Sequence, residues 1–284
     1  MSPFDADRHR AAVQDQWERA AAGWAQRRAA LQETAMPVSQ WLVEAIRPQP
    51  GHTVLELAAG PGDTGLLAAE LITPGGTLIS SDVAQSMVDV ARMRARELGI
   101  DNVEFRVLNA ESIELASARV DAVLCRWGYM LLADPAAALR ETRRVLRPGG
   151  RVALSVWDAA ERNPWASVAM EEMQRVVGGA EAEPGQPGMF ALAPPGRIGE
   201  LMRAAGFTEV EVEALDLTFA FGDLDEWWED RVTLSTSFAD ALAELDPVRR
   251  DEVRAAIDER LAGFAEPDGS LRLPARTLVA AATA

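Results

Sequence analysis

Residues 54–65 are Val-Leu-Glu-Leu-Ala-Ala-Gly-Pro-Gly-Asp-Thr-Gly. Apolar residues run directly into a Gly-Pro-Gly turn and a helical pattern follows, which indicates a buried parallel strand, a tight loop and the start of a helix. Gly60 and Gly62 let the backbone turn tightly and approach a ligand, because neither carries a Cβ. In open α/β sheets, ligands bind at the carboxyl ends of the strands. The stretch therefore predicts a ligand site at this loop.

Two cofactor classes fit these glycines. Gly60-x-Gly62-x-x-Gly65 matches the dinucleotide-binding fingerprint, which is a weak signal by itself. Asp82 lies 20 residues after Gly62, at the end of the next apolar strand, where an acid that binds a ribose is expected. A dinucleotide and S-adenosylmethionine both need that acid, so it does not choose between them.

The charge around the loop favours one of the two. A pyrophosphate needs free backbone N–H donors and no neighbouring anions, whereas Pro61 removes a donor and Glu56 and Asp63 add negative charge. The same carboxylates would attract a sulfonium that carries an amino-acid ammonium. The loop therefore favours S-adenosylmethionine, and an NAD(P)-dependent oxidoreductase stays the alternative.

The composition bounds the class of protein. With 284 residues, 48% of them hydrophobic, the chain can form one large domain or a domain with a small cap. The net charge of −16 argues against nucleic acid or anionic membranes as partners. All 28 basic residues are arginine, so no lysine is present to form a Schiff base.

The chain also lacks the signals of secretion and membrane insertion. Cys125 is the single cysteine, so no internal disulfide can form and a reducing compartment is expected. The first ten residues are charged and have no apolar core, unlike a signal peptide. No run approaches the length of a membrane span. These features predict a cytoplasmic protein, either a monomer or a homodimer.

Strands and helices alternate as far as residue 157. This rhythm is typical of a parallel sheet with right-handed crossovers. Two helices are expected first, over 11–32 and from Pro37 onwards. Strands are then predicted at 53–58, 77–81, 103–108, 120–125 and 151–157, and helices at 64–72, 84–98 and 135–146.

After residue 157 the rhythm breaks. Helices are predicted at 164–177 and 195–205, with a loop rich in glycine and proline over 178–195. Residues 208–221 alternate as a half-exposed strand with a bulge near Ala214. Residues 223–264 are predicted to be helical, with breaks near Ser237 and 246–247, and 271–282 to be a last strand.

Two segments carry a resemblance to a known family. Glu56-Leu57-Ala58-Ala59-Gly60-Pro61-Gly62 corresponds to an acid-x-Gly-x-Gly-x-Gly loop in which Ala58 replaces the first glycine, and Arg144-Val145-Leu146-Arg147-Pro148-Gly149-Gly150 precedes the strand at 151. In both segments the chain resembles the class I S-adenosylmethionine-dependent methyltransferases, particularly the ubiquinone/menaquinone-biosynthesis-like (methyltransferase type 11) branch. The resemblance covers 52–157 well and 196–221 loosely.

The resemblance implies a fold and a division of the chain. The expected fold is a Rossmann-like, seven-stranded α/β sheet of order 3-2-1-4-5-7-6, with strand seven antiparallel, helices on both faces and a helical cap. The cofactor-binding core would be 52–157, completed by 196–222 and 271–284. The cap would comprise the N-terminal helices of 1–51 and insertions at 158–195 and 223–270.

The resemblance also assigns cofactor roles. Asp82 would bind the ribose hydroxyls, with a helix cap as its alternative role. Asn109 would accept from the adenine amino group, and Glu56 would hold the methionine ammonium or serve as a structural carboxylate. The full predicted set is Glu56, Ala58, Gly60, Gly62, Asp82, Val83, Met87, Asn109, Ala110, Glu111 and Arg126.

The methyl acceptor is expected after the strand at 120–125. Arg126 could bind the methionine carboxylate or an anionic acceptor, or pair with Asp134 at the surface. Tyr129, Asp134, Glu226 and Asp230 are the candidate bases, and Arg126, Tyr129 and Asp134 are the predicted catalytic residues. The predicted acceptor pocket is aromatic, or alternatively these rings are ordinary core: Trp24, Trp127, Tyr129, Trp157, Trp165 and Trp227.

The two histidines are not expected to act as bases. His52 precedes the first strand, at the sheet end opposite the cofactor, and His9 lies in what is predicted to be a mobile leader. The sequence has no His/Cys cluster, so no metal is predicted.

The predicted function is methyl transfer to a small or medium apolar acceptor, such as a quinone, phenol or polyketide, by in-line displacement. A non-catalytic S-adenosylmethionine-binding protein is a further alternative.

Overall fold

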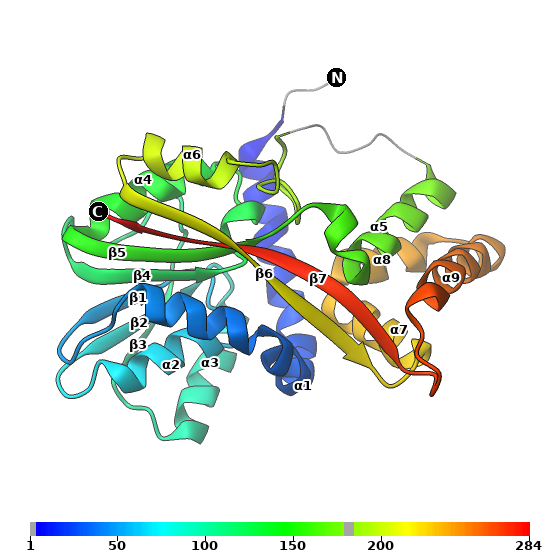
Figure 1. Ribbon diagram of the computed structural model, residues 1–284, viewed down its shortest axis with the longest axis horizontal. Helices are drawn as coiled ribbons and strands as arrows, with labels where there is room; N and C mark the ends of the chain where they lie inside the picture. The colour runs from blue at the N-terminus through cyan, green and yellow to red at the C-terminus, as the bar shows by residue number, and fades with distance from the viewer. Residues whose placement is uncertain (1–3, 179–184) are drawn as a thin grey trace.

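A seven-stranded sheet forms the centre of the molecule (Figure 1). The computed structural model describes residues 4–178 and 185–284. The strand order is β3-β2-β1-β4-β5-β7-β6, with β7 antiparallel to both of its neighbours, as predicted. The strands are β1 (Thr53–Glu56), β2 (Thr77–Asp82), β3 (Val103–Val107), β4 (Val120–Arg126), β5 (Leu146–Trp157), β6 (Thr208–Phe221) and β7 (Leu271–Thr283).

Helices cover both faces of this sheet, and the central strands are apolar on both sides for that reason. Val54, Val123 and Val152 are completely buried on β1, β4 and β5. Figure 1 shows α2 (Asp63–Leu71) and α3 (Gln85–Leu98) on one side of the sheet, and α4 (Pro135–Val145) and α6 (Arg197–Ala204) on the other. From β1 the chain moves outward to β2 and β3, whereas from β4 it moves the opposite way to β5, which leaves a ligand-binding crevice at the carboxyl ends of β1 and β4.

The N-terminal region is one helix rather than two. Helix α1 (Ala6–Ala45) continues through Pro37, where a new helix was predicted to begin. Proline in a helix interior costs one hydrogen bond and causes a steric clash. Here Val38 and Leu42, on the following turns, are fully buried in the main core. This burial offsets the cost, so the helix runs on across the molecule.

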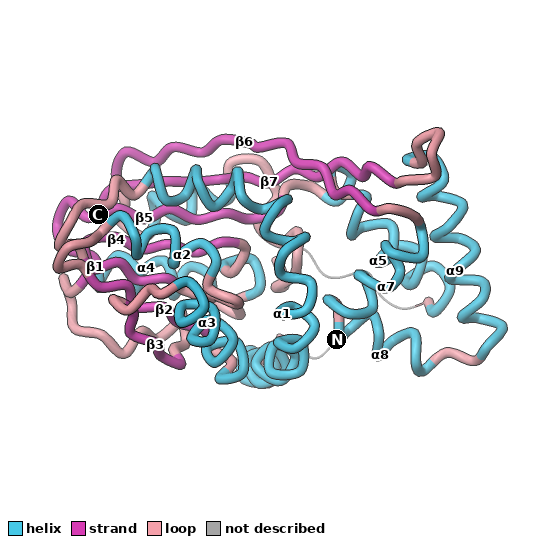
Figure 2. Tube along the Cα trace, turned by 90° about the horizontal axis from the view of Figure 1, so that it is seen from below, coloured by secondary structure: helices cyan, strands magenta, loops and turns pink. Residues whose placement is uncertain are grey.

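Strands β6 and β7 extend beyond the rest of the sheet as a two-stranded ribbon. Pairing of β5 with β7 ends at Trp157 and Thr277, whereas β6 and β7 stay paired as far as Phe221 and Leu271. Helices α7 (Leu224–Leu234), α8 (Thr236–Glu244) and α9 (Pro247–Leu261) connect the far ends of the ribbon, and α5 (Pro164–Val177) packs on α9. Figure 2 shows these four helices, which we call the helical group, gathered at one end of the molecule.

One further detail differs from the sequence predictions. The bulge in β6 lies between Thr208 and Glu211 instead of near Ala214. The first break between the helices falls at Ser235, close to the predicted break near Ser237, and the Ser235 hydroxyl caps α8. In the predicted loop at 178–195, residues 179–184 lie outside the described part.

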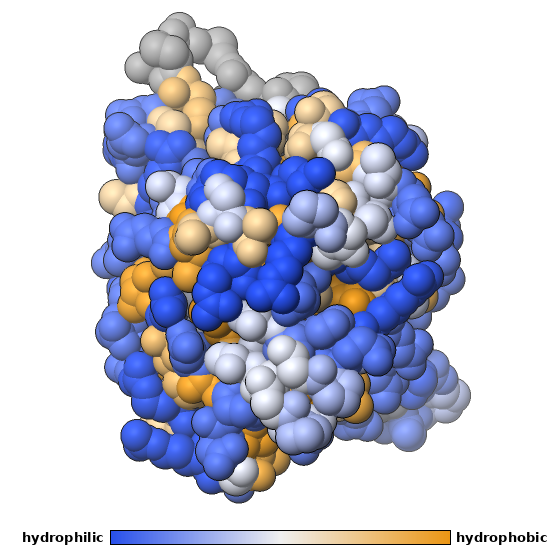
Figure 3. All heavy atoms as spheres, turned by 90° about the vertical axis from the view of Figure 1, so that its left-hand side faces the viewer, coloured by the Kyte–Doolittle hydropathy of each residue, from blue (hydrophilic) through white to orange (hydrophobic). Residues whose placement is uncertain are grey.

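The face at the amino ends of the parallel strands is mostly hydrophilic, with apolar residues in small, separate patches (Figure 3). Within 4–178 and 185–284, no helix is long and apolar enough to cross a membrane.

Candidate cofactor and acceptor site

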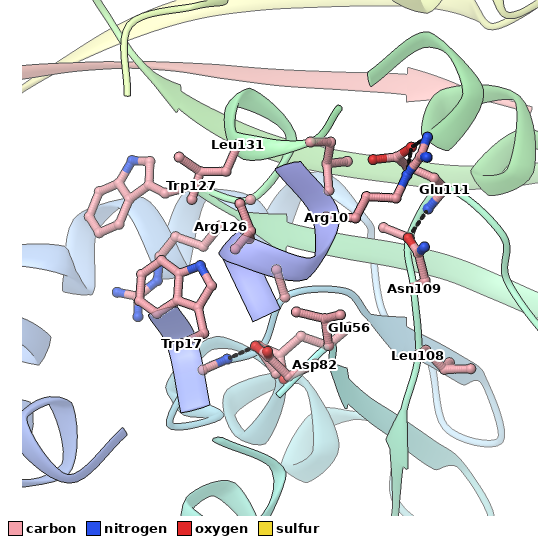
Figure 4. Close-up of a pocket in the computed structure, with 18 of the residues that line it drawn as sticks. Arg10, Trp17, Glu56, Asp82, Leu108, Asn109, Glu111, Arg126, Trp127 and Leu131 are labelled. Carbon is pink, nitrogen blue, oxygen red and sulfur yellow. Dashed lines mark hydrogen bonds and ion pairs between the residues drawn. The ribbon is translucent and has the colours of Figure 1, made fainter. Parts of the chain in front are cut away.

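A cavity lies at the carboxyl ends of β1, β2 and β4, and the N-terminal half of α1 crosses it (Figure 4). Three segments supply its floor: the loop after β1, the end of β2 and the residues after β3. Its other walls come from α1 and from the residues after β4. The lining is His9, Arg10, Val13, Trp17, Trp24, Glu56, Ala58, Ala59, Gly60, Pro61, Thr64, Asp82, Val83, Leu108, Asn109, Ala110, Glu111, Arg126, Trp127, Gly128, Leu131, Leu132 and Ala133.

The loop after β1 has the left-handed backbone that its glycines suggested. Gly60 and Gly62 have φ angles of 53° and 84°. Ala58, which stands where the family has glycine, also has a positive φ, of 50°. A left-handed alanine costs about 1 kcal/mol relative to an ordinary backbone conformation. The loop thus keeps the glycine conformation at Ala58 and tolerates the strain.

Glu56 is buried beneath this loop. Its Oε1 accepts a hydrogen bond from the Gly65 N–H at 2.6 Å, and its Oε2 accepts one from the Ser80 hydroxyl at 3.1 Å. Burial raises the pKa of Glu56 from its ordinary value of 4.5 to about 7, although these hydrogen bonds and the Arg126 charge oppose the rise. The carboxylate therefore braces the start of α2 and also borders the cavity.

Asp82 joins the ends of β1 and β2. Its Oδ2 accepts from the Gly60 N–H at 2.9 Å and its Oδ1 from the Ala84 N–H at 3.0 Å (Figure 4). The residue is 7% exposed, and burial raises its pKa. The carboxylate thus positions the glycine loop and the turn into α3 while it faces the cavity. Its predicted alternative role as the cap of the following helix is wrong, because Ala84 is the N-cap of α3 and no side chain caps that helix.

The segment after β3 is held from both sides. The Asn109 amide oxygen accepts from the Glu111 N–H at 2.9 Å. Glu111 Oε2 accepts from Arg10 of α1, at 2.9 Å from Nε and 2.6 Å from Nη2, and Oε1 accepts from the Ala133 N–H at 2.9 Å. Figure 4 shows Arg10 reaching Glu111 above Asn109. Glu111 therefore links α1 to the residues that follow β4.

Arg126 supplies a cation at the end of β4. Its guanidinium lies over the Trp127 ring, with 5.0 Å between Cζ and the ring centroid. Burial lowers the pKa of Arg126, and the carboxylates of Asp63 and Glu56 oppose the shift. Its Nη1 is buried and, within the described residues, has no hydrogen-bond partner. A buried guanidinium N–H without a partner can bind a carboxylate such as that of a methionine moiety.

Trp127 begins a row of aromatic rings that leaves the cavity. Its ring stacks on Trp157 at 4.2 Å between centroids, and Trp157 contacts Trp165 at 5.0 Å. Trp165 in turn stacks on Phe219 of β6 at 4.1 Å. The Trp127 indole N–H donates to the Thr277 hydroxyl at 2.9 Å, where β7 parts from β5. The row ties the cavity wall to the base of the helical group.

Several residues predicted for the site lie elsewhere. Tyr129 is fully buried, its hydroxyl is 2.5 Å from the Thr142 hydroxyl, and burial raises its pKa. Asp134 caps α4 by accepting from the Ala137 N–H, and its ion-pair partner is Arg140 rather than Arg126. None of the following residues belongs to the described cavity lining: Gly62, Met87, Tyr129, Asp134, Trp157, Trp165, Trp227, Glu226 and Asp230.

Other lining residues were missed in the sequence. His9, Arg10, Val13 and Trp17 come from α1, which places His9 in an ordered helix and not in a mobile leader. The sequence showed the apolar stripe of α1 but did not show which surface of the molecule this stripe contacts. Among the described residues, no group of three or more His, Cys, Asp or Glu side chains could hold a metal ion.

Comparison with known proteins identifies the family. The sequence profile of a methyltransferase domain matches residues 48–214, which is more than half of the chain. The chain belongs to the class I S-adenosylmethionine-dependent methyltransferases.

Relatives of this methyltransferase differ in what they methylate. It is 28% identical over 183 residues to the nocamycin O-methyltransferase of Saccharothrix syringae, which covers 61% of this chain and 65% of that protein. It is 39% identical over 103 residues to a ubiquinone/menaquinone biosynthesis C-methyltransferase of Pasteurella multocida, covering 36% and 38% of the two chains. The matches span from 34% to 65% of the length of these and another curated relative.

Solved structures share the fold of this methyltransferase. The YcgJ protein of Bacillus subtilis aligns with a TM-score of 0.58 at 20% identity, over 86% of this chain and 97% of that one. The [4+2]-cyclase SpnF aligns with a TM-score of 0.53 at 20% identity, over 88% and 81%. Both likenesses concern the fold alone.

Proposed function

We propose that the protein transfers a methyl group from S-adenosylmethionine to a small or medium, largely apolar acceptor by in-line displacement. The observation that carries this proposal is the cavity itself, which brings together Asp82 on its floor, Arg126 at the end of β4 and apolar side chains of α1; among the described residues, Arg126 Nη1 has no hydrogen-bond partner. Polar groups occupy the side that a charged cofactor needs, and apolar groups occupy the side that an acceptor would enter. The family assignment supports methyl transfer from S-adenosylmethionine.

On the cofactor side, each polar residue has a role that its geometry permits. Asp82 would accept from the ribose hydroxyls, Asn109 from the adenine amino group, and Arg126 would donate to the methionine carboxylate. Glu56 provides negative charge near the ammonium. The cofactor, when bound, supplies an electrophilic methyl group on a positively charged sulfur. Backbone at Ala58, Gly60, Val83 and Ala110 would complete the contacts.

On the acceptor side, the walls exclude water and align the two reactants. Val13, Trp17 and Trp24 of α1 line the cavity together with Trp127 and Leu131 of the chain after β4. A well-oriented pair of reactants in a dry site reacts much faster than the same pair in solution. The named relatives include an O-methyltransferase and a C-methyltransferase, both consistent with an organic acceptor. We place the enzyme in the cytoplasm, as a monomer or homodimer without nucleic-acid partners.

The test is calorimetric titration with S-adenosylhomocysteine, with NADH in parallel. Asp82→Asn should weaken S-adenosylhomocysteine binding by about 10–100-fold, because hydrogen bonds to a charged group contribute about 1.5–3 kcal/mol. Asp89→Asn is the matched control, since Asp89 lies on α3 and its carboxylate pairs with Arg92 outside the cavity. Binding of NADH alone would contradict the cofactor assignment. Thermal unfolding of both variants checks that the fold is intact.

A further inference from the structure

His9 stands at the cavity wall with one ring nitrogen already committed. Its Nε2 lies 2.9 Å from the main-chain oxygen of Leu131. A carbonyl oxygen only accepts hydrogen bonds, so Nε2 carries the hydrogen and the neutral ring keeps a lone pair on Nδ1. Within 4–178 and 185–284, no hydrogen bond to Nδ1 is found. The contact with Leu131 thus selects the tautomer in which Nδ1 can accept a proton.

The position of this imidazole is fixed by two separate connections between α1 and the chain after β4. The first is the bond from His9 to Leu131, and the second runs from Arg10 through Glu111 to the Ala133 N–H. Both reach the segment 131–133, which lines the same cavity. The centroid of the Phe4 ring lies 5.5 Å from that of the imidazole, with the two rings tilted. A base in a methyl-transfer site needs such placement, because proton transfer requires hydrogen-bond distance.

The acidic side chains of the wall are less available than His9. All three carboxylates of the described lining accept hydrogen bonds at both oxygens. The partners are Gly65 and Ser80 for Glu56, Gly60 and Ala84 for Asp82, and Arg10 and Ala133 for Glu111. The Tyr129 hydroxyl is bonded to Thr142 in the core. Each of these carboxylate oxygens already accepts a hydrogen bond from the protein, whereas His9 Nδ1 accepts none among the described residues.

We propose that His9 is the general base of the reaction and that the acceptor presents a phenolic or enolic hydroxyl on an aromatic or conjugated ring. The inference rests on the methyl transfer proposed above. A neutral amine attacks through its own lone pair and needs no base beforehand, whereas a hydroxyl becomes a good nucleophile when it loses its proton. The flat rings of Trp17, Trp24 and Trp127 in the lining suit a planar acceptor.

The acceptor O–H bond breaks and its proton moves to His9 Nδ1, so that the imidazole becomes an imidazolium. The acceptor oxygen, or the ring carbon conjugated to it, bonds to the methyl carbon while the methyl–sulfur bond breaks and its electron pair stays on sulfur. If carbon attacks, the ring hydrogen at that carbon then leaves as a proton and aromaticity returns. The Leu131 carbonyl dipole stabilises the imidazolium through Nε2–H. His9 is half-buried, so water can take up the proton afterwards.

The experiment compares His9→Gln with the wild type on para-methoxyphenol, phenol and para-nitrophenol near neutral pH. The glutamine amide N–H can still donate to the Leu131 oxygen, so the variant keeps the structural contact and loses the base. Turnover of para-methoxyphenol should fall on the order of 10²–10⁴-fold, the usual contribution of a general base. The loss should shrink steadily toward para-nitrophenol, which is the most acidic and arrives mostly ionised. Affinity for S-adenosylhomocysteine should stay within about twofold of the wild type.

His52→Gln is the matched control, because His52 is the chain's other histidine and accepts from the Gln49 N–H at the far end of the sheet. It should leave turnover unchanged. An equal loss for all three phenols, or wild-type turnover of none of them, would overturn the inference while S-adenosylhomocysteine binding keeps the cofactor assignment intact. Loss of that binding in the wild type would overturn both. If added imidazole restores the turnover of His9→Ala, this result would directly support the role of His9 as the general base.

Discussion

The cofactor side of the cavity differs in construction from the packed aromatic rings behind the cavity wall, which we call the aromatic side. On the cofactor side, Glu56 bonds to Gly65 and Asp82 to Ala84, so several contacts join residues fewer than ten positions apart. On the aromatic side, Trp127 bonds to Thr277, 150 positions away, and Trp227 to Trp165, 62 positions away. The first side depends on local backbone geometry, and the second depends on how distant elements pack. The two sides should therefore respond differently to mutation.

The largest expected effect concerns the buried Glu56 carboxyl. Its pKa rises from 4.5 in the ordinary state to about 7 in the folded protein, so the folded state binds its proton more tightly. This stabilisation is complete below about pH 4.5 and is lost as the pH rises toward 7, by about 3 kcal/mol in total. Glu56→Gln should remove this loss of stability with rising pH, because glutamine does not titrate. Denaturant unfolding of both proteins between about pH 4.5 and 8 measures it.

Parallel pH profiles for the wild type and Glu56→Gln would contradict that explanation. They would show that the carboxyl stays ionised on folding, held by the Gly65 N–H, the Ser80 hydroxyl and the Arg126 charge. The sign of the change in the free energy of unfolding with pH is informative in either case. A paired surface carboxylate would make the protein more stable as the pH rises.

Gly65→Ala should have the next largest effect. A Cβ at this position would lie 2.2 Å from Glu56 Oε2, and the buried carboxylate cannot move away freely. We expect a loss of about 2 kcal/mol in the free energy of unfolding, together with weaker S-adenosylhomocysteine binding. Gly263→Ala is the control, since nothing lies within 4 Å of the added Cβ. If both alanine variants behave alike in unfolding and calorimetry, the close approach at Gly65 is unimportant.

Trp227→Phe tests the aromatic side. Trp227 is 1% exposed and its indole N–H donates to the Trp165 oxygen at 3.3 Å. Phenylalanine keeps an aromatic ring but removes the donor, which should lower the free energy of unfolding by about 1 kcal/mol. Because Trp227 lies outside the cavity lining, S-adenosylhomocysteine affinity should not change. A tenfold loss of affinity would show that the two sides are coupled through the row of rings.

The sequence predicts the features that depend on local backbone geometry better than those that depend on the packing of distant elements. The sequence could place Asp82 beside the glycine loop because a strand, a turn and the next strand end fix their positions locally, and their roles toward the cofactor stay predictions. It could not place the Tyr129 ring, since an aromatic residue after a strand looks the same whether its ring turns to the cavity or, as here, to Thr142 in the core. His9 was missed because its position depends on a 40-residue helix that continues past Pro37. Spacing along a chain does not reveal which distant surface such a helix meets.

The smallest expected effect is at Ala58, and it tests how strictly the backbone conformation of the loop after β1 is fixed. Ala58 has a φ of 50°, so Ala58→Gly removes about 1 kcal/mol of left-handed strain. It also adds about 0.4–1 kcal/mol of conformational entropy to the unfolded chain, and the free energy of unfolding should therefore change by less than about 0.5 kcal/mol. Ala58→Val should lower it clearly, because a β-branched residue resists this backbone and its side chain would enter the cavity. Chemical denaturation measures both. A large gain in Ala58→Gly would mean that the loop stores strain here, and tolerance of valine would mean that the backbone at this position is free to relax.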